Sequence, residues 1–143
     1  MEIEKIYRLS LKIIASIFLA ASLLHLVWNQ LFSTYTEMKG LTEIQRDMIY
    51  LLNLSIALYH FTFSILLFGI SSMTSLTLNQ LRAFSALILV FWMFRLLLEF
   101  IFPVQVPFVI LPDPSISLKI LMVTQIIILA LPEILLRAGK KAG

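Results

Sequence analysis

Polar and ionisable side chains interrupt the long apolar stretches of this sequence. They are imidazoles, carboxamides, one guanidinium and one carboxylate, groups that can bind an anion, move a proton or ligate a metal. The seven candidates are His25, Asn29, Asn53, His60, Arg95, Glu99 and Gln125. Because a charge in the centre of a bilayer costs at least about 2.5–3.5 kcal/mol, such residues usually face the interior of a helix bundle. We therefore expect them to line a binding site.

The spacing of these candidates places them on shared helix faces. His25 and Asn29 are four residues apart, and Asn53 and His60 are seven apart, so each pair lies on one face of an α-helix. Arg95 and Glu99 are also four residues apart, a spacing at which a guanidinium and a carboxylate can pair.

Four long apolar segments must position these side chains. Each is close to the roughly 20 residues that a helix needs to cross the hydrocarbon core of a bilayer. The segments run approximately over residues 9–31, 48–70, 81–102 and 116–136. The sequence therefore predicts an all-α integral membrane protein, a four-helix transmembrane bundle of up-down-up-down topology with both termini on the same side. We expect residues 1–143 to form a single domain.

The composition also favours a membrane protein. Hydrophobic residues make up 60% of the chain and charged residues 13%, whereas soluble domains have about 45–50% and about 25%. There is no cysteine, which excludes disulfides and thiolate metal sites. The net charge is +3, and the basic residues cluster near the chain ends, so we interpret them as signals of topology and exclude a nucleic-acid partner.

The basic residues outside the segments predict the orientation. If both termini are cytoplasmic, the inner side carries seven of them: Lys5, Arg8, Lys12, Arg82, Arg137, Lys140 and Lys141. The outer side carries three: Lys39, Arg46 and Lys119. Because lysine and arginine are retained on the cytoplasmic side, the sequence predicts a multi-pass protein of the cell membrane with cytoplasmic N- and C-termini.

A helical rise of about 1.5 Å per residue gives the depth of each candidate. Five fall at similar heights in the outer half of the bilayer: His25, Asn29, Asn53, Arg95 and Glu99. His60 and Gln125 lie just below them. This predicts a polar pocket in the outer half that binds a small anionic or amphipathic ligand. Arg95 is its charge anchor, and the other residues supply hydrogen bonds.

Other interpretations of the same residues remain open. The amides can serve only to link helices, and Arg95 with Glu99 can be a structural pair. His25 and His60 are the two histidines of the chain, so a bis-histidine haem site in a four-helix bundle is an alternative. Their heights differ by roughly 6 Å. Two histidines without a set of carboxylates predict no other metal site.

Two further classes of function are alternatives to ligand binding. A His–Glu–Arg group could move protons on a lipid-soluble substrate. Four spans with a histidine in the first and an arginine in the third resemble the four-helix sterol-isomerase-type domain, which implies a membrane enzyme without assigning a catalytic residue. The chain could instead be an accessory subunit of a larger membrane complex, or a homo-oligomer within the lipid bilayer.

Overall fold

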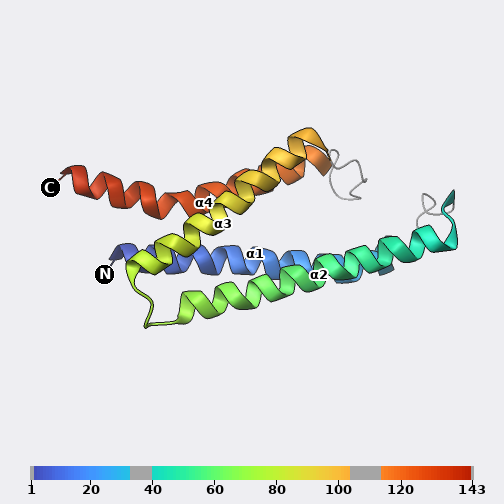
Figure 1. Cartoon of the computed structure of the whole chain (residues 1–143), viewed down its shortest axis with the longest axis horizontal. Helices are drawn as coiled ribbons and strands as arrows, with labels where there is room; N and C mark the ends of the chain where they lie inside the picture. The colour runs from blue at the N-terminus through green and yellow to red at the C-terminus, as the bar shows by residue number, and fades with distance from the viewer. Residues whose placement is uncertain (1, 33–39, 104–113, 143) are drawn as a thin grey trace. The chain divides into compact units, whose positions relative to one another are not determined.

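The computed structural model describes residues 2–32, 40–103 and 114–142. It contains four helices: α1 (Glu2–Phe32), α2 (Glu43–Ser72), α3 (Leu78–Ile101) and α4 (Pro114–Ala142) (Figure 1). All four are long and apolar enough to cross a membrane. The predicted all-α fold of four membrane-spanning helices is confirmed, and the chain is a multi-pass membrane protein.

The helix ends follow local sequence signals. Pro114 is the first residue of α4, as its preorganised backbone favours. A capping box opens α3, because the Thr77 hydroxyl accepts from the Gln80 backbone N–H while the Gln80 side chain accepts from the Thr77 backbone N–H. All four helices start earlier than the predicted spans, at Glu2, Glu43, Leu78 and Pro114.

The chain divides into two compact units. We call residues 12–70 the α1–α2 unit, and residues 1–11 together with 71–143 the α3–α4 unit. The first turns of α1 thus belong with α3 and α4, and the rest of α1 belongs with α2. That all four helices form one domain stays a prediction.

Serine hydroxyls hold the α1–α2 unit together. Ser22 donates to the Ala57 carbonyl at 2.8 Å and Ser64 donates to the Ala15 carbonyl at 2.9 Å. Ser22 follows Ala15 on α1, but its partner Ala57 precedes Ser64 on α2. The two helices therefore run antiparallel (Figure 1). Both alanines are buried, since small residues let two helix backbones approach closely where lipid provides no hydrophobic drive for association.

In the α3–α4 unit, helices α3 and α4 are also antiparallel (Figure 1). Arg82 meets Glu133 at one end of the pair, and Glu99 meets Ser115 at the other. Tyr7, near the start of α1, donates its hydroxyl to Glu133, near the end of α4, at 2.7 Å. The start of α1 and the end of α4 therefore lie on the same side, as predicted.

Arg8 secures the connection between α2 and α3 in the same unit. Its guanidinium donates to the carbonyls of Ser71, Met73 and Leu76 at 3.3, 2.6 and 3.2 Å. Glu4 accepts from the same guanidinium at 2.7 Å. Because the last carbonyls of a helix have no partner within it, Arg8 supplies donors that the end of α2 requires. The sequence indicated only a topology signal at this position.

Candidate functional site

The carboxylate of Glu133 gathers side chains from three helices. Oε2 accepts from the Tyr7 hydroxyl at 2.7 Å and from Arg82 Nε at 2.9 Å. Oε1 accepts from Arg82 Nη2 at 2.8 Å and from Arg137 Nε at 3.0 Å. Arg82 thus binds the carboxylate with two parallel bonds, the geometry that best fixes a guanidinium in space. We call these four residues the Glu133 cluster.

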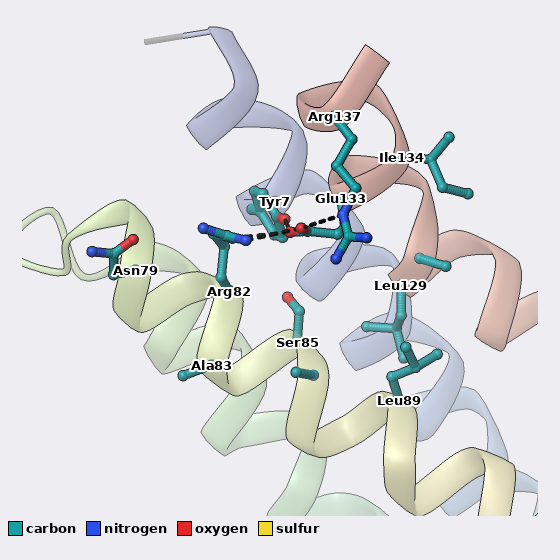
Figure 2. Close-up of a pocket in the computed structure, with 12 residues that line it drawn as sticks. Tyr7, Asn79, Arg82, Ala83, Ser85, Leu89, Leu129, Glu133, Ile134 and Arg137 are labelled. Carbon is teal, nitrogen blue, oxygen red and sulfur yellow. Dashed lines mark hydrogen bonds and ion pairs between the residues drawn. The ribbon is translucent and has the colours of Figure 1, made fainter. Parts of the chain in front are cut away.

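The Glu133 cluster stands at the head of a groove of about 570 Å³ between α3 and α4 (Figure 2). Beyond the cluster, the walls are mainly apolar. They include Leu89 of α3, and Leu129 and Ile134 of α4, with three alanines between them. The groove is therefore charged at the end that holds the Glu133 cluster and apolar along the rest of its length. This arrangement suits a molecule with an anionic group and a hydrocarbon part.

The Glu133 cluster carries a net positive charge, because two guanidinium groups share one carboxylate. Nη1 of Arg82 and both Nη atoms of Arg137 make no hydrogen bond to the residues that the structure describes. Arg137 is 76% exposed, so its free donors are accessible. Guanidinium donors that the shared carboxylate leaves unused are suited to a second anion such as a phosphate or a carboxylate.

Three predicted site residues do meet within the α1–α2 unit. The rings of His25 and His60 stack with centroids 5.6 Å apart, and the Asn53 side chain hydrogen-bonds to His25. His60 Nδ1 lies 2.8 Å from the Ile56 carbonyl, which can only accept, so this nitrogen carries the proton. These side chains therefore face one another across α1 and α2; that they bind a ligand stays a prediction.

The same geometry does not favour the haem alternative. His25 lies one turn beyond Ser22 on α1, and His60 lies between Ala57 and Ser64 on α2. Since Ser22 and Ser64 each bond to a carbonyl of the facing helix, the two backbones are in close contact around the histidines. There is no width between them at this level for a macrocycle.

Arg95 and Glu99 pair as their spacing predicted, at 3.4 Å. Glu99 is fully buried in the α3–α4 unit and also accepts from the Ser115 hydroxyl at 3.0 Å. The Arg95 side chain is partly exposed. The carboxylate thereby links the end of α3 to the start of α4. That Arg95 anchors a ligand, and that this pair shares a pocket with the histidines, both stay predictions.

Gln125 is fully buried on α4, and neither atom of its amide has a hydrogen-bond partner among residues 2–32, 40–103 and 114–142. An unsatisfied buried amide costs about 1–3 kcal/mol. We expect Gln125→Leu to raise the free energy of unfolding by about 1 kcal/mol in a detergent titration. Thr124→Val, at the exposed neighbouring position, is the matched control and should change stability little. A clear loss of stability in Gln125→Leu would show that the amide is bonded.

Of the seven predicted site residues, Asn29 has a side chain that lies outside the described residues.

The residues of the Glu133 cluster were missed by the sequence analysis, which did not assign Tyr7, Arg82, Glu133 or Arg137 to a site. A partial signal was present, because Glu133 and Arg137 are four residues apart, but no spacing relates this pair to Arg82 or Tyr7.

No protein-family model matches this chain, and neither a curated protein nor a solved structure matches it. The support for a function therefore comes from the chemistry of the sites. Of these, the groove between α3 and α4 combines space, free donors and apolar walls.

Proposed function

We propose that the protein binds an anionic amphiphile of the membrane in the groove between α3 and α4. The observation that carries this proposal is that two guanidinium groups lie at one end of a groove whose other walls are mainly apolar (Figure 2). The anionic group binds to the free Nη donors of Arg82 and Arg137, and the hydrocarbon part lies against Leu89 and Leu129. This keeps the predicted class of ligand and moves its site away from Arg95.

Charge complementarity supports a ligand from the membrane itself. The end of the protein that holds the Glu133 cluster also carries Lys5, Arg8 and the two C-terminal lysines. We place this end on the cytoplasmic side of the cell membrane, following the bias in lysine and arginine. Acidic lipids are enriched in the cytoplasmic leaflet, and each basic residue near that surface contributes about 1 kcal/mol of attraction to the membrane.

The apolar walls support an amphiphile over a free inorganic anion. Half of the residues that line the groove are leucine, isoleucine or alanine, and their side chains have no group that can bind a phosphate ion. Each CH₂ group that leaves water adds about 0.8 kcal/mol of binding free energy. A ligand with a hydrocarbon part therefore uses the whole groove, while a free anion uses only its head.

Arg137→Gln provides the first test. We expect this variant to lower the affinity for dioleoyl phosphatidic acid roughly three- to tenfold, because one charge-assisted hydrogen bond is lost. Binding is measured by native mass spectrometry of the detergent-solubilised protein. Arg137 is largely exposed, so the fold should persist. Arg46→Gln removes the same charge from an exposed position at the start of α2 and should leave the affinity unchanged.

Two results would contradict the proposal. One is an equal loss of affinity in Arg137→Gln and Arg46→Gln, which would show attraction to net charge alone. The other is binding of dioleoyl phosphatidylcholine by the wild type as tightly as the acidic lipid, which would remove the role of the guanidinium groups.

A further inference from the structure

Ser85 holds an unusual position in the groove between α3 and α4. It is 3% exposed, and its hydroxyl has no hydrogen-bond partner in the part of the chain that the structure describes. Figure 2 shows this hydroxyl on the side of α3 that faces Tyr7 and Glu133. A buried hydroxyl without a partner is unfavourable, so its place at the groove points to a partner that comes from a ligand.

Other hydroxyls in the helices of this protein behave differently. Ser16, Ser55 and Thr124 each donate to the carbonyl four residues earlier in their own helix, at 3.0, 2.8 and 2.9 Å. This is the usual way in which a serine or threonine satisfies its hydroxyl within a helix. Ser85 could reach the Leu81 carbonyl in the same manner, yet its hydroxyl makes no such bond.

The depth of Ser85 gives the chemistry of its missing partner. Ser85 is three residues after Arg82 on α3, which places it about one turn, or roughly 4.5 Å, deeper along the groove. A ligand whose anionic group binds Arg82 therefore presents its next few atoms to Ser85. In a glycerophospholipid, those atoms are the glycerol oxygens and the ester carbonyls that follow the phosphate.

We propose that the ligand of the groove is an ester-linked acidic glycerophospholipid, and that Ser85 donates its hydroxyl to an ester carbonyl of that lipid. This inference rests on the proposed function, since Arg82 and Arg137 must bind the phosphate. The acyl chains then continue past Leu89 and Leu129 to the lipid-exposed surface of α3 and α4. A fatty acid or an alkyl phosphate has the anionic group but no acceptor at this depth.

The experiment compares two phosphatidic acids that differ only in the linkage of their chains. Dioleoyl phosphatidic acid has ester carbonyls, and its dioleyl ether analogue has none. We expect the wild type to bind the ester roughly three- to tenfold more tightly than the ether, the effect of one hydrogen bond. Native mass spectrometry with both lipids in the same sample gives the ratio directly, and this comparison requires no variant.

The Ser85 variants then assign the preference to one atom. Ser85→Ala should bind the two lipids equally, by losing affinity only for the ester, whereas Ser85→Thr should restore the preference. Ser55→Ala removes an exposed hydroxyl that bonds to its own helix and should keep the wild-type ratio. A melting curve of each variant confirms that it is folded.

The outcomes separate this inference from the proposed function. If the wild type binds the ester and the ether equally, or if Ser85→Ala keeps the preference, the role of Ser85 is overturned. Tighter binding of both acidic lipids than of dioleoyl phosphatidylcholine would still support the anionic amphiphile. If neither acidic lipid binds better than phosphatidylcholine, both proposals fail.

Discussion

Replacing Glu133 with glutamine is expected to lower the free energy of unfolding by about 2–3 kcal/mol. The carboxylate accepts four hydrogen bonds from Tyr7, Arg82 and Arg137, and a bond to a charged group contributes about 1.5–3 kcal/mol. The neutral amide leaves two guanidinium groups close together without a counter-charge. Unfolding of the detergent-solubilised protein in a titration with a denaturing detergent measures the loss.

Asp47→Asn is the matched control for this change. Asp47 is exposed near the start of α2, and exchange of its carboxylate for an amide should alter stability by less than about 0.5 kcal/mol. If Glu133→Gln is as stable as the wild type, the Glu133 cluster does not hold the α3–α4 unit together.

Arg82→Gln is expected to lower the affinity for dioleoyl phosphatidic acid roughly ten- to hundredfold, the effect of losing a charge-assisted bond at a partly buried site. The same variant also loses its bonds to Glu133, so its stability falls. Glu133→Gln separates the two effects. That variant is destabilised too, but it frees both guanidinium groups from their carboxylate, and we expect it to bind the acidic lipid at least as tightly as the wild type.

This difference in sign makes the comparison decisive. Both affinities are measured by native mass spectrometry at a temperature where melting curves show each variant to be folded. Equal losses of affinity in Arg82→Gln and Glu133→Gln would mean that the lipid responds to the integrity of the fold. Arg82 would then have no direct role in binding it.

The helices could be predicted from the sequence because, in a bilayer, helix formation depends only on residues within the same segment. In hydrocarbon, every backbone polar group must be satisfied within its own segment, so an apolar stretch of sufficient length is a helix whatever its neighbours. The same holds for the capping box of Thr77 and Gln80 and for Pro114 at the start of α4. Each depends on residues at most three positions apart.

The Glu133 cluster could not be predicted in this way. Tyr7 and Glu133 are separated by 126 positions, and Arg82 and Glu133 by 51, so no spacing relates them. Lysine and arginine near the ends of spans also serve as topology signals, and that explanation accounts for Arg82 and Arg137 without any contact. The position of the Ser85 hydroxyl depends on its rotamer, which the sequence does not specify.

The predicted outer pocket illustrates the same limit. The antiparallel pairing of α1 and α2 brings His25 to His60 and Asn53, although the depths predicted for the two histidines differ by roughly 6 Å. Depth alone assigns no ligand to Arg95 or Gln125, since residues at one height can face different neighbours. Arg95 pairs with Glu99, while the amide of Gln125 makes no bond to any described residue.

Photo-crosslinking tests the location of the ligand most directly. The wild-type protein is reconstituted in phosphatidylcholine vesicles with a small fraction of a phosphatidic acid that carries a diazirine in one acyl chain, and the labelled residues are mapped by mass spectrometry. We expect labelling concentrated on Leu89, Leu129 and Ile134, and competed away by unlabelled phosphatidic acid. Labelling spread evenly over the lipid-exposed faces of α1, α2, α3 and α4, without competition, would contradict binding in the groove.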